Sequence, residues 1–80
     1  MSNIPKKPTR IEKGLLLAVV WLYQDAHSPS MAANIARDFG VHDLDVSGHA
    51  EFDIAVFAKL NASEGTRFFL EDAAMKGGSA

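Results

Sequence analysis

The residues best suited to chemistry are gathered in one short stretch near the middle of the chain. The side chains there that bind metals or transfer protons are His42, Asp43, Asp45 and His49. The two histidines are seven residues apart, whereas the histidines of a helical zinc site lie one helical turn apart. A calcium site is not indicated either, because no calcium-type loop ends in a bidentate glutamate. We therefore interpret the stretch as a solvated acidic surface and expect no metal or other cofactor.

Groups suited to catalysis are equally sparse elsewhere in the chain. Glu51 and Asp53 are both carboxylates, but side chains two positions apart on a helix diverge instead of meeting around a substrate. The serines stand where helix caps are expected, and no Gly-x-Ser-x-Gly sequence is present. The chain has no cysteine, which excludes disulfides and thiolate chemistry. The sequence therefore predicts a protein that is not an enzyme, and a cytoplasmic location fits its lack of cysteine.

One stretch has the pattern of a known binding motif. Gly40 follows a helical pattern as a turn glycine would, with Ala36 four residues before it and Val46 six residues after it. In helix-turn-helix proteins, these two places are usually apolar because the two helices touch there. Residues 33–46 therefore resemble the helix-turn-helix family. The resemblance implies a DNA-binding transcription regulator whose second helix enters the major groove, with Arg37 and the basic N-terminal residues on phosphates.

The charge of the same region favours a different partner. His42–Asp53 holds four carboxylates and neither lysine nor arginine, and the whole chain has a net charge of −2. A surface that meets phosphates is expected to be basic. An acidic surface favours a basic partner protein, for example one that binds nucleic acid, because complementary charges speed association. A protein is therefore the preferred partner, and nucleic acid is the alternative.

Periodicity and capping residues predict two helices in the first half of the chain. Thr9 and Glu12 have the form of a capping box, which starts a helix over residues 10–26. A second helix, over residues 29–39, begins with a Ser-Pro pair and ends at Gly40 in the left-handed conformation. The side chains expected to face the core are Ile11, Leu15, Ala18, Val19 and Leu22 from the first helix and Met31, Ile35, Ala36 and Phe39 from the second.

Two further helices are predicted in the second half. One covers residues 49–60, and the other covers residues 62–75 with Asn61 as its capping residue. The stripe expected to be buried on the former consists of Phe52, Val56 and Leu60. Residues 42–48 fit either a loop or a helix. We expect an all-α fold, a compact bundle of four short helices, with a helix-turn-helix-like pair left open.

The chain's 80 residues suffice for one domain. Residues 1–8 are expected to form a flexible arm, residues 9–75 a single helical domain and residues 76–80 a disordered tail. The apolar run at residues 14–23 is too short to span a bilayer, and no signal-peptide cleavage site follows it. No contact with a membrane is therefore expected.

The first helix carries more apolar side chains than one face can use. Those outside its predicted core stripe include Leu16, Val20, Trp21 and Tyr23. Either the other helices surround this helix and bury them, or they form a contact surface. Because tryptophan and tyrosine are frequent interface anchors, we expect Trp21 and Tyr23 to contact a partner. The charged contact residues expected alongside them are Asp43, Asp45, Glu51 and Asp53.

Together these patterns predict a small non-enzymatic protein-binding module that acts through an apolar patch and an acidic surface. In size and composition it resembles the accessory or inhibitor proteins of bacteriophages and mobile elements. Its partner is expected to be another protein, and a homodimer is left open. The alternative is a helix-turn-helix transcription regulator, which would bind duplex DNA in a strongly salt-dependent way.

Overall fold

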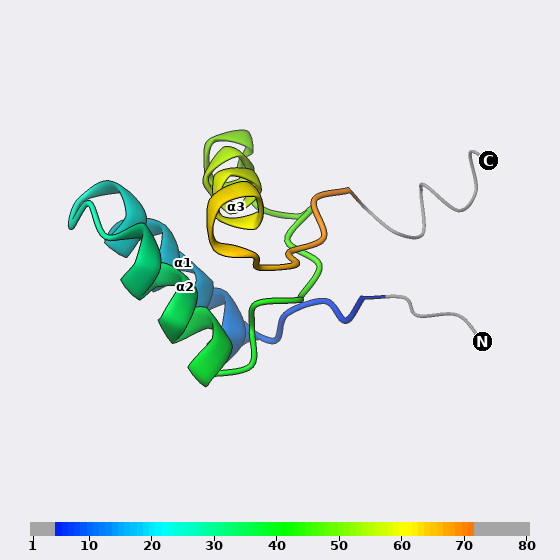
Figure 1. Ribbon diagram of the computed structural model, residues 1–80. Coiled ribbons are helices and arrows are strands. Elements are labelled where there is room, and N and C mark those ends of the chain that lie inside the picture. The colour runs from blue at the N-terminus through cyan, green and yellow to red at the C-terminus, as the bar shows by residue number, and fades with distance from the viewer. Residues whose placement is uncertain (1–4, 72–80) are drawn as a thin grey trace.

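A capping box starts the first helix, as the sequence predicts. The structure is a computed structural model that describes residues 5–71 of the chain (Figure 1). Helix α1 is Arg10–Gln24. The Glu12 backbone N–H donates to Thr9 Oγ1 at 3.2 Å, and the Thr9 N–H donates to Glu12 Oε1 at 2.8 Å. Two amides that the helix leaves without partners are satisfied in this way, so the start of α1 is fixed by local chemistry.

The second helix ends at a glycine, which is also as predicted. Helix α2 is Pro29–Asp38, with its proline in the first turn. Gly40 has φ 68°, and the Val41 N–H donates to the Ala36 carbonyl at 2.8 Å. The Gly40 N–H donates to the Arg37 carbonyl at 3.1 Å, which completes a Schellman motif. Val41, the next residue, is fully buried, so the motif turns the chain back onto the core.

The third helix is longer than predicted, and the predicted fourth helix is wrong. Helix α3 is Glu51–Glu64, and Gly65 ends it in the left-handed conformation with φ 75°. The proposed start of a helix at residues 62–64 is the last turn of α3, and residues 65–71 are not helical. The last four residues of the predicted helix, 72–75, and the predicted tail lie outside the described residues. Asn61 does not cap a new helix, because its side-chain amide bonds to the chain that follows α3.

The long connection between α2 and α3 is a loop held between two other extended segments. The Asp45 N–H donates to the Lys6 carbonyl at 2.8 Å, so the loop pairs with the N-terminal arm. On its other side, the Val46 N–H donates to the Phe69 carbonyl at 2.9 Å, and the Phe69 N–H donates to the Leu44 carbonyl at 3.0 Å. This is a parallel bridge between Asp45 and Phe69. The loop therefore joins the arm to the segment that follows α3.

The helix-turn-helix-like pair is not formed. Twelve residues, 39–50, separate α2 from α3, whereas the motif needs a short turn between its helices. Val46, expected on the second helix of such a pair, is fully buried in the loop. The main-chain pairing with Phe69 explains why this stretch is not helical, because its amides are already bonded across to another segment. The chain is thus all-α and compact, with three helices in the part that the structure describes.

The core lies where α1 and α2 run side by side and α3 packs across them (Figure 1). Three alanines of α2 are buried with a stripe of α1 that the sequence pattern placed partly outside the core. The buried apolar residues are Leu16, Val19, Val20, Ala32, Ala33, Ala36, Val41, Leu44, Val46, Val56, Phe57, Leu60 and Phe68. Because alanines let two helices approach closely, little space is left between α1 and α2 for a longer side chain.

Several residues predicted to be buried are instead exposed. Met31 and Phe39 of α2 are 53% and 57% exposed, because the adjacent alanines occupy the contact with α1. On α3, Phe52 lies in the first turn and is 65% exposed, whereas Val56 and Leu60 of the same predicted stripe are buried as expected. These side chains are therefore available at the surface and do not contribute to the core.

Candidate protein interface

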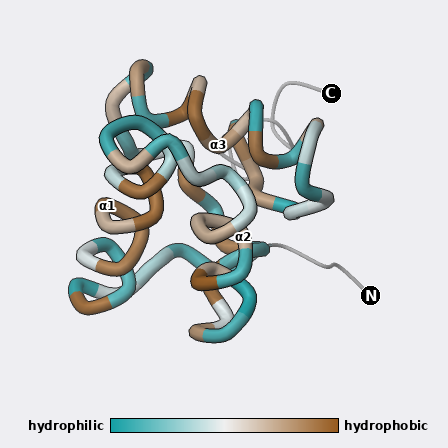
Figure 2. The backbone as a smooth tube through the Cα atoms, turned by 60° about the vertical axis from the view of Figure 1, so that its left-hand side comes forward, coloured by the Kyte–Doolittle hydropathy of each residue, from teal (hydrophilic) through white to brown (hydrophobic). Residues whose placement is uncertain are grey.

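The predicted core stripe of α1 is correct for Leu15, Val19 and Leu22 but wrong for Ile11 and Ala18, which are exposed. Leu16, Val19 and Val20 face the core, so the residues on the opposite side of the helix face solvent. We call that side the α1 outer face, and its exposed apolar and small residues are Ile11, Gly14, Leu17, Ala18 and Trp21. In Figure 2 much of the tube of α1 is brown, which reflects the high share of apolar residues in this helix.

The large apolar residues of the α1 outer face are exposed to solvent. Ile11, Leu17 and Trp21 are 79%, 55% and 56% exposed. At Gly14, a Cβ atom would meet nothing within 4 Å, so the surface at this position is open. A single exposed apolar residue is common on a protein surface, but several on one helical face mark an interaction site.

The two predicted aromatic anchors lie on different sides of α1. Trp21 belongs to the outer face, which is consistent with a role in binding. Tyr23 is half-buried and packs against the core cluster, because two residues correspond to more than half a turn of helix. The structure therefore does not bring Trp21 and Tyr23 together into one surface. Ile11 and Leu17, which were not among the predicted contact residues, accompany Trp21 instead.

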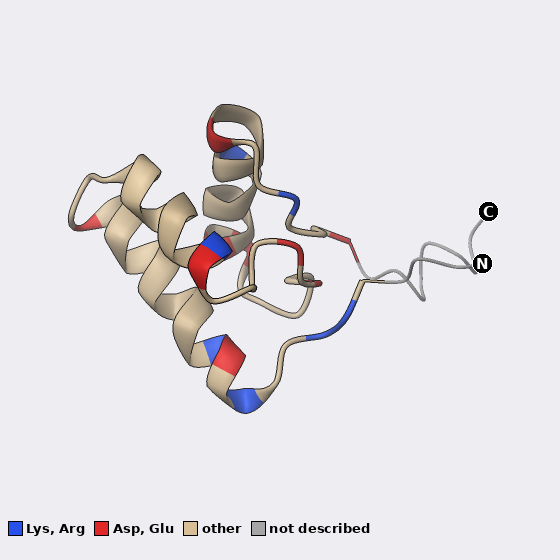
Figure 3. Ribbon diagram, turned by 60° about the horizontal axis from the view of Figure 1, so that its bottom comes forward, with Lys and Arg blue, Asp and Glu red and all other residues tan. Residues whose placement is uncertain are grey.

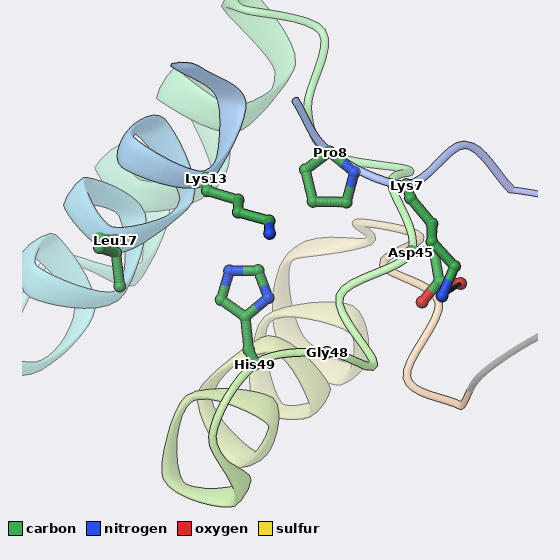
Figure 4. Close-up of a pocket in the computed structure, with 7 residues that line it drawn as sticks. All are labelled: Lys7, Pro8, Lys13, Leu17, Asp45, Gly48 and His49. Carbon is green, nitrogen blue, oxygen red and sulfur yellow. Dashed lines mark ion pairs between the residues drawn. The ribbon is translucent and has the colours of Figure 1, made fainter. Parts of the chain in front are cut away.

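A cleft with a polar rim adjoins the outer face at Leu17. It has a volume of about 450 Å³ and also extends between the arm and the start of α3. Its lining residues are Lys7, Pro8, Lys13, Leu17, Asp45, Gly48 and His49. Figure 4 shows the Lys13 side chain directed toward the His49 ring across the cleft. The imidazole also makes an edge contact with Phe57, with a centroid distance of 5.5 Å, which anchors it against the core.

Asp45 is buried in this cleft, so it is not part of an exposed acidic surface. Its side chain is 1% exposed, and its Oδ1 accepts a hydrogen bond from the Ser47 backbone N–H at 2.9 Å. The Lys7 ammonium lies 3.9 Å from Oδ2, which has no hydrogen-bond partner. The carboxylate thus holds the loop in its turn, and the expectation that Asp45 contacts a partner is not supported by its position.

The other three predicted acidic contacts are dispersed. Asp43 is exposed and lines a second cleft, of about 600 Å³, together with the cations Lys6 and Arg67. Glu51 is exposed and Asp53 half-buried, and both lie in the first turn of α3, where negative charge interacts favourably with the helix dipole. Figure 3 shows the acidic residues on separate elements with basic residues among them. They do not form one continuous acidic surface.

Residues suited to metal binding are not brought together in the described part of the chain. Within residues 5–71, no three acidic or histidine side chains converge to hold a metal ion. His49 lines the cleft beside Leu17, whereas the buried Nδ1 atom of His42 has no hydrogen-bond partner. None of the helices in the same range combines the length and hydropathy that crossing a bilayer requires. The apolar α1 outer face is therefore the strongest candidate site in the described part of the chain.

Comparison with known proteins does not assign this site. No protein-family model, no curated protein and no solved structure matches the chain. The function is therefore argued from the surface itself.

Proposed function

We propose that this protein is a non-enzymatic protein-binding domain and that its contact surface is the α1 outer face. One observation carries the proposal. Ile11, Leu17 and Trp21 are each more than half exposed on one side of a helix whose other side forms the core. A helix with two apolar sides is expected where a second protein covers the side that its own domain leaves open.

The composition of this surface supports the proposal. Burying one large apolar side chain contributes roughly 1.5–3 kcal/mol, and tryptophan is among the residues that most often dominate binding energy. Trp21 has apolar neighbours on the same face, while Arg10 and Lys13 are exposed along its edge. An apolar centre with a charged rim is the usual anatomy of a protein interface.

A photo-crosslinking experiment tests this assignment. A benzophenone amino acid replaces Trp21 in the full chain expressed in cells, and a matched chain carries it at Met31 of α2. Met31 is a suitable control because it is also an apolar helical residue, with a similar exposed fraction of 53%. We expect a discrete protein adduct from position 21 and none from position 31. Equal labelling from both positions, or no adduct from position 21 in a folded chain, would contradict the proposal.

Duplex DNA is the alternative partner and requires a separate measurement. Electrophoretic mobility at low and moderate salt distinguishes the two functions, because DNA binding weakens steeply as salt displaces the protein from phosphates. Under the proposal, the chain does not shift duplex DNA at low salt. A shift that disappears as salt rises would favour the regulator instead.

A further inference from the structure

We infer that the α1 outer face binds a second copy of this chain, with the two α1 helices packed antiparallel. The inference rests on the proposed function, since it names the partner of the same surface. It follows from the spacing, the size and the charge of the residues along the face.

The spacing of the outer face suits a helix-on-helix contact. Ile11, Gly14, Ala18, Trp21 and Asp25 follow one another at alternating intervals of three and four residues. This spacing places them in one line along a helix, as in the contact line of two helices that pack at a small crossing angle. In an antiparallel pair, Ile11 of one copy lies opposite Trp21 of the other, and Gly14 lies opposite Ala18.

The sizes of these residues are complementary in that arrangement. The small pair, Gly14 and Ala18, occupies the middle of the line, so the two backbones can approach closely there. Nothing within 4 Å of a Cβ at Gly14 stands in the way of such an approach. The large residues Ile11 and Trp21 meet at both ends, where the space between the helices is wider. Leu17 lies beside the two-fold axis and packs near its own counterpart.

The charges of α1 select the antiparallel orientation. Arg10 lies in its first turn, whereas Asp25 caps its end and its last turn carries no basic residue. Antiparallel packing brings Arg10 of each copy toward Asp25 of the other, and it also aligns the helix dipoles favourably. Parallel packing would place like charges together at both ends. Because a two-fold contact must complement itself, this polarity favours a second copy.

The length of α1 sets the expected strength of the pair. A helix of 15 residues is about 22 Å long, so a single helix pair falls at the low end of the sizes of specific interfaces. We therefore expect a reversible dimer with a dissociation constant in the micromolar range, not an obligate one.

Sedimentation velocity over a range of protein concentrations tests the inference. The full chain has a mass of 8.6 kDa, and we expect this to double as the concentration rises through the micromolar range. Trp21→Glu is expected to raise the dissociation constant by at least about tenfold. The matched control is Phe52→Glu, since Phe52 is an exposed aromatic residue on α3, and this variant should dimerise like the native chain.

A charge reversal tests the orientation. Arg10→Glu alone is expected to weaken the dimer, because the introduced carboxylate would approach Asp25 of the second copy. Adding Asp25→Arg should restore the affinity by re-forming the pair with opposite polarity. Both substitutions complement the dipole of α1, so these variants are expected to stay folded.

Three results would overturn the inference. A native chain that stays monomeric at the highest concentration excludes self-association. In that case, a photo-crosslinked adduct between position 21 and a different protein would still support the proposed function. A dimer that tolerates Trp21→Glu excludes this face. If adding Asp25→Arg to the Arg10→Glu variant does not restore the affinity of the dimer, the antiparallel arrangement is excluded.

Discussion

The side-chain amide of Asn61 binds both main-chain groups of Phe68. Its Oδ1 accepts from the Phe68 N–H at 2.9 Å, and its Nδ2 donates to the Phe68 carbonyl at 2.9 Å. The same Oδ1 accepts from the Thr66 hydroxyl at 2.8 Å. Asn61 thus acts like the edge of a neighbouring strand, and it fixes the segment that leaves α3.

Replacement of Asn61 is therefore expected to be costly. Asn61→Ala leaves the buried Phe68 amide without a partner and should lower the free energy of unfolding by about 2–3 kcal/mol. Asn61→Asp keeps the acceptor for the Phe68 N–H but turns a carboxylate oxygen toward the Phe68 carbonyl, so it should also destabilise the fold. Urea denaturation measures both, with Ser63→Ala as the control, because the exposed Ser63 hydroxyl bonds only to the Lys59 carbonyl of its own helix. An Asn61→Ala variant as stable as Ser63→Ala would contradict this role.

Substitutions at two residues with left-handed backbone conformation should change the stability of the fold in opposite directions. Gly40 has φ 68°, and Gly40→Ala should destabilise the fold by about 1 kcal/mol because a Cβ disfavours that conformation. His27 has φ 52° in the turn between α1 and α2, so His27→Gly should relieve strain and stabilise by up to about 1 kcal/mol. Thermal unfolding of both variants checks the signs. A stabilising Gly40→Ala would show that the helix end differs from a Schellman motif.

Glu12 gives the fold a pH dependence. The Thr9 backbone N–H bonded to its carboxylate, helped by Lys6, lowers the pKa of Glu12 below its ordinary value. A carboxyl group with a lowered pKa in the folded state stabilises the fold above the pKa it has when unfolded. That contribution is lost as the pH falls through the folded value.

The corresponding test compares Glu12→Gln with the native chain. The native chain should be the more stable of the two at neutral pH, and the difference should shrink as the pH falls below about 4. Melting temperatures across this range measure the difference, and an NMR titration of Glu12 gives its pKa directly. A constant difference at all pH values would show that the capping bond does not depend on the charge.

Two variants of Asp45 test whether this carboxylate has a structural role. Asp45→Asn retains an oxygen for the Ser47 N–H and removes a buried charge, so it should change stability by less than about 1 kcal/mol. Asp45→Ala removes that acceptor and should cost about 1–2 kcal/mol. Urea denaturation compares the two variants. If Asp45→Asn is as destabilising as Asp45→Ala, the negative charge itself is needed. The ion pair with Lys7 would then contribute more to the free energy of unfolding than its 3.9 Å separation suggests.

The features that were predictable from the sequence are those whose cause is local. Thr9 and Glu12 cap α1 through neighbouring amides, and Gly40 ends α2 through its own backbone conformation. In both cases the partners lie within a few residues, so a pattern of residue types is enough to identify them. The helical class and the positions of α1 and α2 follow from such signals.

Where the cause is distant, the same patterns gave wrong predictions. Asn61 stands three residues before Glu64, like Thr9 before Glu12, yet its amide bonds to Phe68 and no helix follows within the described residues. Gly65 falls inside the helix predicted over residues 62–75, but it ends α3. The partner of Asn61, a segment beyond the helix, is not encoded in the local pattern.

The core stripe of α1 was predicted only in part, for another reason. An apolar residue occurs on nearly every side of this helix, so periodicity alone allowed two core stripes. The charged residues of the helix would have indicated which stripe faces solvent, since Arg10, Lys13 and Asp25 are all exposed. Trp21 was correctly placed outside the core, whereas Ile11 was not, because it shared a stripe with truly buried neighbours such as Val19.

The main-chain bonds of the loop also indicate the order in which parts of the protein fold. Asp45 pairs with Lys6 on one side of the loop, and Val46 pairs with Phe69 on the other. The α1–α2 hairpin is built from neighbouring contacts and can form early, whereas the loop must wait for a residue far along the chain. During synthesis, the hairpin therefore emerges with part of its core side uncovered until α3 has been made. In that interval the growing chain exposes apolar surface on both sides of α1, and only one of them is later closed by its own fold.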